Sequence, residues 1–355
     1  MAYAGSVKRV IVVIGKVPNL LHVLYVYVFG DLSLDLKPII MMRTTSTLAA
    51  AACSLLMLSG CHKGTGIGPG AQGGDLNALF EQRVENAAQT FTVNATTGGV
   101  ITGEDGVQVL FGPGAFRNSA GQVVSGPVQV KLVEALAIGD MIRFNKQTVG
   151  NDNGILRLLR SGGEIRVTAT QGQEQLELGP QGMRVNVPTA QPDPNMQVFL
   201  SNGMTEQNMI WSLADSIAVD TTGTGWTGEP GPTPFYYQFT APSFQWINCD
   251  YFAGFSNTSI CRATTPLDMP RDSTMIWFAF PSENAVMGSG WQDPNIYLTY
   301  QVVPIGFQMI VVGLSRNGTD YQSAFSTVTV TPDMTIPLTF QPTTLADFET
   351  ALDGF

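Results

Sequence analysis

Residues 107–111 (VQVLF), 128–132 (VQVKL) and 164–168 (EIRVT) decide the fold class, because apolar and polar residues alternate in all three segments. A period of two places the apolar side chains on one face of a β-strand and the polar side chains on the other. Glycine-containing turns separate the segments. Several short strands at this spacing predict a β-sandwich over about residues 90–190.

A helical period precedes these strands. Its apolar positions are Leu76, Leu79, Phe80, Val84 and Ala87. Spacings of three and four residues place them on one helical face, and Asp75 can cap the start of the helix. We therefore predict that residues 75–190 contain a short amphipathic helix followed by the first β-sandwich-like domain.

The second half of the chain repeats the alternating pattern with more aromatic residues. Its strand candidates are 197–200, 236–239, 274–280, 296–300, 308–314, 326–330 and 335–340. Residues 188–194 (PTAQPDP) form a composition break, which favours a domain boundary there. We predict a second β-rich domain over residues 195–342 and a short C-terminal helix within 343–355. The predicted fold class is all-β, with two β-sandwich-like domains and a short N-terminal helix.

The N-terminal region carries a processing motif. Residues 58–61 (LSGC) end an apolar run at 48–58 that is shorter than the roughly 20 residues of a membrane-spanning helix. LSGC resembles the lipobox of bacterial lipoproteins. This resemblance implies a lipoprotein signal peptide over residues 41–60, cleavage before Cys61 and lipidation of Cys61. Residues 61–74 then form a glycine-rich tether.

Residues 1–40 precede the place where a signal peptide should begin. We interpret them as an upstream start that has been assigned too early, with translation beginning at Met41 or Met42. The rival interpretation is a membrane helix across residues 10–29. Polar residues and a proline divide that stretch into apolar runs that are too short to span a bilayer.

The charge balance argues against partners that carry many phosphate groups. The full chain has 18 Lys+Arg, 28 Asp+Glu and a net charge of −10, and removal of residues 1–60 leaves a net charge of −13. Nucleic-acid binding depends on a surplus of basic residues, so we expect no nucleic-acid partner. An acidic body also avoids anionic headgroups, so the acyl chains on Cys61 would supply the membrane attachment.

Further motifs suggest a family. Residues 106–116 (GVQVLFGPGAF) and 126–134 (GPVQVKLVE) resemble a strand, turn and strand of the first sandwich in the ankyrin and netrin-receptor supramodule. Residues 161–165 (SGGEI) and 246–250 (WINCD) are similar to segments of uncharacterised envelope lipoproteins from Bacteroidota-type bacteria. The resemblance implies a fold and a compartment, and it implies no activity.

The residues that follow Cys61 indicate which face of the outer membrane the protein occupies. In Bacteroidota, export to the cell surface is linked to acidic residues directly after the lipidated cysteine. Here His62, Lys63 and Gly64 follow Cys61, and the first acidic residue is Asp75. The resemblance therefore favours the periplasmic face over the cell surface.

Two cysteines lie in the predicted body, Cys249 and Cys261. An exported chain meets an oxidising compartment, so this even pair is a disulfide candidate. The alternative is two buried free thiols. Neither cysteine has the companions that a metal site needs, and we expect no metal or other cofactor.

The inventory of reactive side chains restricts catalysis. Both histidines, His22 and His62, lie outside the predicted body, so a Ser-His-Asp or Cys-His catalyst has no base. Glu134 and Glu164 leave open a glycosidase that works with carboxylates alone. The alternative places them at solvent-facing strand positions or in buried ion pairs with Arg157, Arg160 or Arg166. The sequence therefore favours a protein that is not an enzyme.

Tryptophan offers candidates for ligand binding. Trp226 and Trp291 lie in glycine-rich sequence that predicts loops, where an exposed indole ring can stack on a sugar. The alternative is that each ring covers the edge of a core. Trp246 and Trp277 have apolar neighbours and are predicted to be buried.

These observations predict a non-catalytic lipoprotein of the cell envelope, attached to the outer membrane and acting as an interaction or structural module. Its partners would be the membrane, through the lipid anchor, and envelope proteins or glycans. The first alternative is a carbohydrate-binding lipoprotein of a glycan-uptake system. The second is the carboxylate-only glycosidase.

Overall fold

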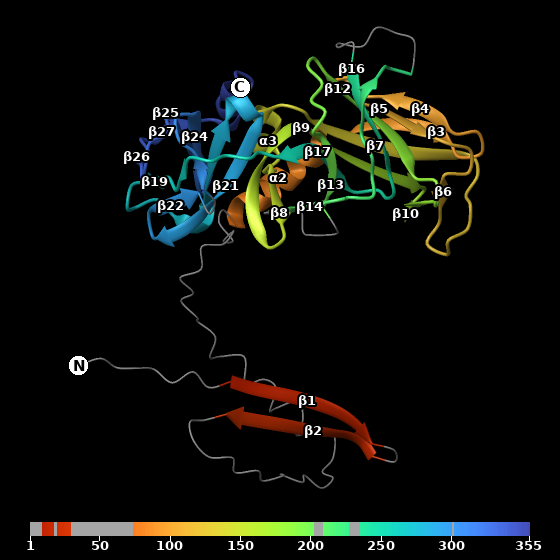
Figure 1. Ribbon diagram of the computed structural model, residues 1–355, viewed down its shortest axis with the longest axis horizontal. Coiled ribbons are helices and arrows are strands. Elements are labelled where there is room, and N and C mark those ends of the chain that lie inside the picture. The colour runs from red at the N-terminus through yellow and green to blue at the C-terminus, as the bar shows by residue number, and fades with distance from the viewer. Residues whose placement is uncertain (1–8, 18–19, 30–73, 202–208, 227–234, 300–301) are drawn as a thin grey trace. The chain divides into compact units, whose positions relative to one another are not determined.

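The computed structural model describes residues 9–17, 20–29, 74–201, 209–226, 235–299 and 302–355 (Figure 1). The chain divides into two compact units, residues 1–64 and residues 65–355. In the first unit, β1 (Arg9–Val17) and β2 (Leu20–Phe29) pair as an antiparallel hairpin. The predicted signal peptide, Cys61 and the tether up to residue 73 lie outside the described residues.

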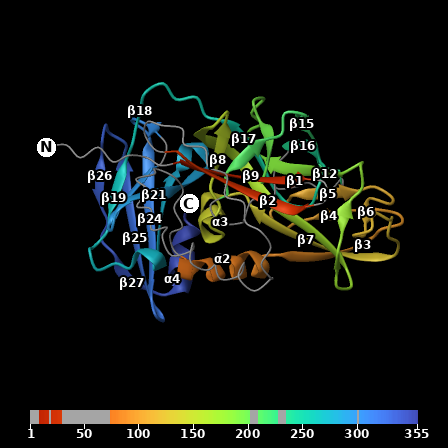
Figure 2. The ribbon, with the colours of Figure 1, turned by 90° about the horizontal axis from the view of Figure 1, so that it is seen from below.

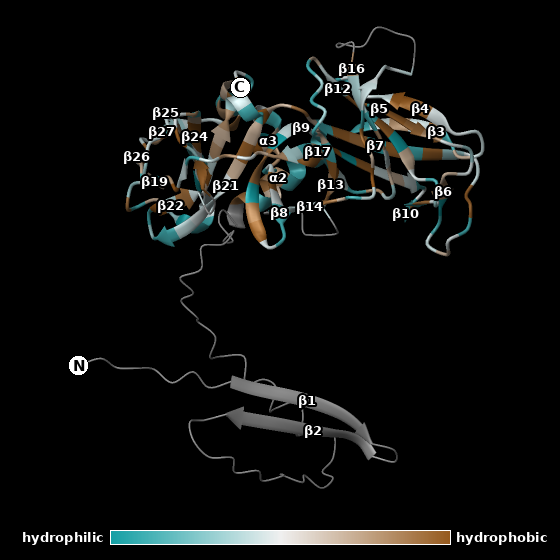
Figure 3. Cartoon of the chain, viewed as in Figure 1, coloured by the Kyte–Doolittle hydropathy of each residue, from teal (hydrophilic) through white to brown (hydrophobic). Residues whose placement is uncertain are grey.

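The described part of the second unit is mostly β-structure, as the alternating sequence predicts. The expected all-β class is confirmed at this level. Hydrophobic stretches run along the strands, and many of the turns between them are hydrophilic (Figure 3). None of the described helices is long and apolar enough to cross a membrane.

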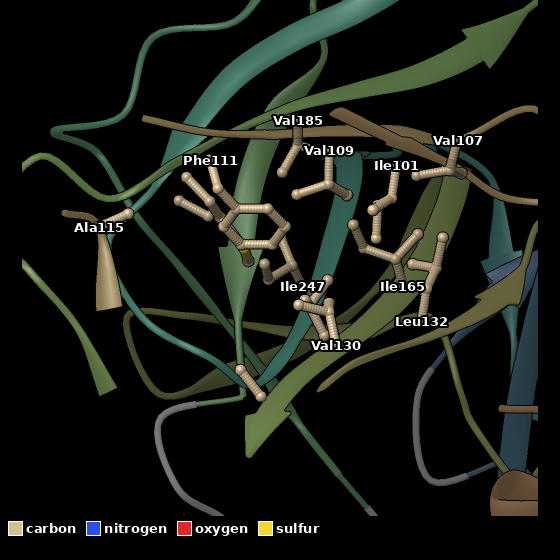
Figure 4. Close-up of a cluster of buried hydrophobic side chains, with 14 of the residues drawn as sticks. Ile101, Val107, Val109, Phe111, Ala115, Val130, Leu132, Ile165, Val185 and Ile247 are labelled. Atoms are coloured by element: carbon tan, nitrogen blue, oxygen red, sulfur yellow. The ribbon is translucent and has the colours of Figure 1, made fainter. Parts of the chain in front are cut away.

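Two sheets that face each other form what we call the first β assembly. Its core lies between them and includes Val109, Val130, Ile165, Val185 and Ile247 (Figure 4). The five-stranded sheet, in pairing order, contains β15 (Asp220–Gly223), β16 (Phe235–Ala241), β12 (Met183–Thr189), β5 (Gln108–Phe111) and β4 (Gly99–Thr102). The facing eight-stranded sheet contains β17 (Trp246–Phe252), β13 (Gln197–Leu200), β14 (Trp211–Leu213), β8 (Val149–Asp152), β9 (Ile155–Gln171), β7 (Pro127–Ala135) and β3 (Gln89–Asn94), with β10 (Glu174–Gln175) beside β9. A small separate pair joins β6 (Phe116–Arg117) and β11 (Glu177–Leu178).

Strand pairing continues past the predicted boundary at residues 188–194. β12 ends at Thr189 and pairs with β16, whereas β13 pairs with β17, which in turn pairs with β9. The first β assembly therefore extends to Phe252. The proline-rich segment ends one strand and leads the chain from one sheet to the facing sheet, because proline cannot donate a ladder hydrogen bond. A composition break marks a strand end here and does not mark the end of an assembly.

The long strand β9 belongs to a closed ring of strands. Its N-terminal residues pair with β8 and its middle with β17, while β14 connects β13 to β8 in a parallel pairing. The order β9, β17, β13, β14, β8 therefore returns to β9. This ring contacts the C-terminal part of the unit. Val149 of β8 and Leu158 of β9 pack into a second hydrophobic core, which is formed mainly by residues 261–340.

The second β assembly is one eight-stranded sheet whose strands contribute to a shared core (Figures 1 and 2). In pairing order it contains β26 (Thr335–Pro337), β19 (Arg262–Thr264), β22 (Ile296–Thr299), β21 (Ala285–Asp293), β20 (Thr274–Phe280), β24 (Gln308–Asn317), β25 (Asp320–Thr329) and β27 (Gln341–Thr343). The remaining short elements are β18 (Thr258–Ser259), β23 (Val303–Pro304) and two 3-10 turns at Arg271–Ser273 and Pro281–Glu283.

Three helices pack on β20, β21 and β24: α2 (Gly74–Asn86), α3 (Ile138–Arg143) and α4 (Leu345–Leu352). Phe80 of α2 meets the ring of Trp277 edge-on, with 5.8 Å between ring centroids. The N-terminal helix, predicted as part of the first domain, therefore buries much of its apolar face on the second β assembly. The spacing of apolar residues in the sequence predicts which face of a helix is apolar, but it does not predict which sheet that face will pack against.

Candidate functional site

The two body cysteines are free and lie in different cores. Cys249 of β17 faces the core of the first β assembly, whereas Cys261 belongs to the core of the second. The predicted disulfide does not form in this structure, and the alternative of two buried thiols describes it correctly. Burial raises the pKa of both thiols, to about 11 for Cys261, so both stay protonated at neutral pH.

Trp226 lies directly after β15 and is partly exposed. Its backbone N–H donates to Oε1 of Gln108 at 2.9 Å, and the Cζ atom of Arg184 lies 4.9 Å from the centroid of the indole ring. Arg184 is on β12, so these contacts place Trp226 on the outer face of the five-stranded sheet. Trp226 is therefore a partly exposed residue whose ring lies beside the Arg184 guanidinium.

Trp291 does not lie in a loop. It belongs to β21 and pairs with Tyr297 of β22, and its indole Nε1 is buried without a hydrogen-bond partner in the described chain. The Cζ atom of Arg271 lies 3.7 Å from the ring centroid. The glycines beside Trp291 suggested a loop, but Gly288 stands in the strand because the side-chain amide of Gln147 approaches it closely. Trp246 and Trp277 are buried, as predicted.

Glu134 holds a turn in place. Its carboxylate accepts hydrogen bonds from Nε2 of Gln89 at 2.8 Å and from the backbone N–H groups of Asp105 and Val107 at 3.1 and 2.9 Å. A Cβ atom on Gly103 would overlap this carboxylate. Burial raises the pKa of Glu134, while the hydrogen bonds oppose that rise. The carboxylate that the sequence offered as a catalyst therefore has its oxygens occupied by its own chain.

A β-bulge directs Glu164 into the interior. Glu164 pairs with Asn248 and Ser161 pairs with Asp250, so Gly162 and Gly163 together oppose the single residue between them on β17. In a regular strand, Ser161 and Glu164, which are three residues apart, would point to opposite faces of the sheet. The bulge places them on the same face. Gly163 supplies the backbone for the bulge with a φ of 123°.

The bulge gathers four polar side chains with little or no solvent exposure: Ser161, Glu164, Asn248 and Asp250. The Oγ atom of Ser161 lies 3.3 Å from Oδ1 of Asn248, and the amide of Asn248 donates to Oδ2 of Asp250. No described group forms a well-aligned hydrogen bond within 3.5 Å to either oxygen of Glu164 or to Oδ1 of Asp250, although the Trp211 side chain is close enough to Glu164 to lower its pKa. Because adjacent Cys249 faces the core, these polar groups occupy the opposite face of β17.

Residues 145–148, between α3 and β8, cover this polar face. Lys146 is almost completely buried, and its Nζ atom lies 4.7 Å from the centroid of the Trp246 ring. The neighbouring Trp211 donates from Nε1 to the backbone oxygen of Gln147 at 2.6 Å. Gln147 and Thr148 also bind the backbone of β21, so the segment joins the two β assemblies.

The electrostatics of this cluster favour neutral carboxyl groups. Burial first, and then the nearby Asp250, raise the pKa of Glu164 well above its usual value, whereas Lys146 lowers it. Burial likewise raises the pKa of Asp250. A charged carboxylate loses its hydration in such a place, so the protonated form is preferred.

The arginines that the sequence offered as partners pair with other acids. Arg157 binds Asp152, Arg160 binds Glu283 and Arg166 binds Glu85, with N–O distances of 2.7–2.9 Å. Glu164 lies instead near Lys146 and Asp250, which are distant in sequence. Only the glycine pair before Glu164 could have signalled a bulge, and nothing in the sequence shows which side chains the bulge gathers.

Comparison of the sequence with protein-family models and with curated proteins finds no match. The resemblances to the supramodule sandwich and to Bacteroidota lipoproteins therefore stay predictions. Among the described residues, no group of three or more His, Cys, Asp or Glu is placed to hold a metal ion.

Proposed function

We propose that this protein is a non-catalytic, lipid-anchored module of the cell envelope that binds or organises other envelope components at the outer membrane. The observation that carries the proposal is the order along the chain: the lipobox-like segment 58–61, a glycine-rich stretch, and a β-rich body that begins at Gly74. This order suits a folded body held away from a lipid anchor by a tether. The net charge of −13 after Cys61 supports the same arrangement.

The positions of the carboxylates support a non-catalytic role. Glu164 has no solvent exposure, and the oxygens of Glu134 accept three hydrogen bonds from the protein. A glycosidase needs two carboxyl groups that face a bound sugar across a cleft. Glu134 and Glu164, the two candidates for glycosidase catalysis, are both buried, so neither carboxyl group faces a cleft.

We also propose, first, that the two β assemblies are β-sandwich-like domains. We further propose that the first assembly is related to the supramodule sandwich and that the protein occupies the periplasmic face of the outer membrane. Two facing sheets around one core support the first point for the first β assembly, and the core shared by the strands of the eight-stranded sheet supports it for the second. The hydrogen bonds of Gln147 and Thr148 to β21 support a body that presents its surfaces in a fixed arrangement.

Cell fractionation tests the anchor. The wild-type protein should stay with the membrane fraction until detergent releases it, and Cys61→Ala should shift the protein to the soluble fraction or leave its precursor unprocessed. Cys53→Ala is the matched control, because Cys53 lies inside the apolar run and not at the motif. Equal membrane association of all three proteins, with Cys61→Ala processed to the same size as the wild type, would contradict lipidation at Cys61. Protease treatment of intact cells, with a periplasmic control, distinguishes the two faces.

One observation favours glycan binding as the second candidate function. The partly exposed Trp226 stands beside the Arg184 guanidinium, and the two present an aromatic ring and hydrogen-bond donors to solvent. A glycan array should then show binding that Trp226→Ala removes and that Trp291→Ala leaves intact. Binding that survives Trp226→Ala would exclude this site.

A further inference from the structure

The outer face of the five-stranded sheet carries a stacked arginine without an acidic partner. Arg184 of β12 is exposed, and its Cζ atom lies 4.9 Å from the centroid of the Trp226 ring. Arg157, Arg160 and Arg166 each bind an acid, but the Arg184 guanidinium forms no ion pair and no hydrogen bond among the described residues. A guanidinium stacked on an indole keeps its charge and its N–H donors, which remain for an acidic group from outside the chain.

Residues 223–226 lie close against the sheet and fix Trp226 on this face. The backbone N–H of Trp226 donates to Oε1 of Gln108 at 2.9 Å, and Nε2 of Gln238 donates to a backbone oxygen of the segment at 2.8 Å. A Cβ atom on Gly223 would overlap the side chain of Gln238, so this close approach requires glycine. The position of Trp226 is therefore set before any ligand arrives, which lowers the entropic cost of binding.

Apolar side chains extend this face across the two neighbouring strands. Arg184 of β12 pairs with Leu110 of β5, and Leu110 pairs with Val100 of β4. Directly paired residues have their side chains on the same face of a sheet. Leu110 and Val100 therefore lie beside Arg184, and Val100 is 40% exposed. Because adjacent strands are about 4.8 Å apart, the three side chains cover about 10 Å from the charged group to apolar surface.

We propose that this face binds an acidic glycan, with the carboxylate of a uronic acid residue on Arg184 and the C–H groups of its ring against Trp226. The proposal depends on glycan binding as the second candidate function, and it names the class of glycan. A guanidinium presents parallel N–H donors that match the two oxygens of a carboxylate. An indole packs against the apolar face of a sugar ring, while Leu110 and Val100 offer apolar contacts to the next sugar residue.

Strand pairing favours a glycan over an acidic peptide as the carrier of the carboxylate. β12 pairs with β16 and β5, and β5 pairs with β12 and β4. The backbone groups of both strands are therefore used within the sheet. An extended peptide that binds by strand addition needs a free sheet edge, which this part of the face does not offer.

The net negative charge of the protein does not prevent this contact. The chain after residue 60 has a net charge of −13. Charges on an exposed surface are largely screened beyond about 8 Å at physiological ionic strength. The guanidinium that touches the ligand therefore decides the interaction, and the distant acids only slow the approach of an anion.

A glycan array with matched pairs tests the carboxylate. Each pair contains an oligosaccharide of galacturonic, glucuronic or mannuronic acid and the same oligosaccharide with its carboxyl groups reduced to neutral alcohols. The purified full-length protein should bind at least one acidic member about 10-fold or more tightly than its neutral counterpart. Equal binding of both members would overturn the role of the carboxylate and leave glycan binding intact. Binding to no glycan, or only to acidic peptides on the same array, would overturn both.

Two arginine variants assign the preference to this face. Arg184→Gln should reduce the affinity for the acidic member to that for its neutral counterpart. Arg316→Gln is the matched control and should keep the preference, because Arg316 also stacks on an aromatic ring, that of Tyr321 at 5.8 Å, but lies on the second β assembly. An unchanged preference in Arg184→Gln would overturn the assignment. The wild-type comparison alone decides whether the carboxylate is recognised, even if a variant does not fold.

Discussion

The buried phenol of Tyr297 should make the stability of the protein depend on pH in the alkaline range. Tyr297 has no solvent exposure, and burial raises its pKa from 10.0 to about 12. The folded protein therefore holds this proton more tightly than the unfolded chain. Its stability should be unaffected below pH 10 and should fall as the pH rises through the folded pKa, by on the order of 1–2 kcal/mol from this group.

Tyr297→Phe should remove this part of the alkaline loss. Urea unfolding between pH 8 and pH 12 would measure it, and the thiol of Cys261, with a raised pKa of about 11, should account for part of the remaining slope. At pH 7 the variant should lose less than about 1 kcal/mol, because the buried hydroxyl forms no well-aligned hydrogen bond in the described chain beyond a weak contact with Thr274. Identical alkaline slopes in both proteins would show that Tyr297 is not the group that titrates.

Single residues also show the limits of sequence reasoning. The burial of Trp246 and Trp277 was predicted from their apolar sequence neighbours, and both side chains are buried in the structure. The strand position of Trp291 was not predicted, because Gly288 near it suggested a loop but lies in β21, where the side-chain amide of Gln147 approaches it closely. The partners of Glu164 come from segments far apart in the chain, and pairing over such distances depends on the tertiary fold.

At the scale of elements, the bulge in β9 is the feature that positions the candidate site. Gly163→Ala should disrupt it in two ways, because φ is 123° and the new Cβ would lie 2.6 Å from Cδ2 of Leu136. We expect a loss of roughly 2–4 kcal/mol in the free energy of unfolding. Chemical unfolding measures it.

Gly154→Ala provides the matched control for this element. Gly154 also has a positive φ, of 90°, but its Cβ would meet no atom within 4 Å. It should lose only the backbone contribution, about 1 kcal/mol. Equal losses in the two variants would mean that close packing at the bulge does not matter.

Elements were predicted better than their connections. The alternation in 107–111, 128–132 and 164–168 falls in β5, β7 and β9, and the final helix lies within the predicted 343–355. The proline-rich segment 188–194 proved to be a connection within one assembly, and α2 packs on a sheet from the other half of the chain. Local patterns specify strands and helices, whereas the pairing of sheets depends on contacts between distant segments.

At the scale of the whole molecule, the body that the structure describes is rich in β-structure, and the reactive groups named above serve its own structure. Glu134 orders a turn, Cys249 and Cys261 fill two cores, and Glu164 lies at the junction of the two assemblies. Such a body suits a module that presents surfaces rather than one that transforms a substrate. The proposal then depends on where the body is held, which is decided by Cys61.

Mass spectrometry of the protein isolated from its native membranes tests most directly whether Cys61 is the lipidated N-terminus of the mature protein. The account predicts that the most N-terminal peptide begins at Cys61 and carries acyl chains, with no peptide from residues 1–60. A mature protein that retains residues before Cys61, or that carries an unmodified Cys61, would contradict the central claim.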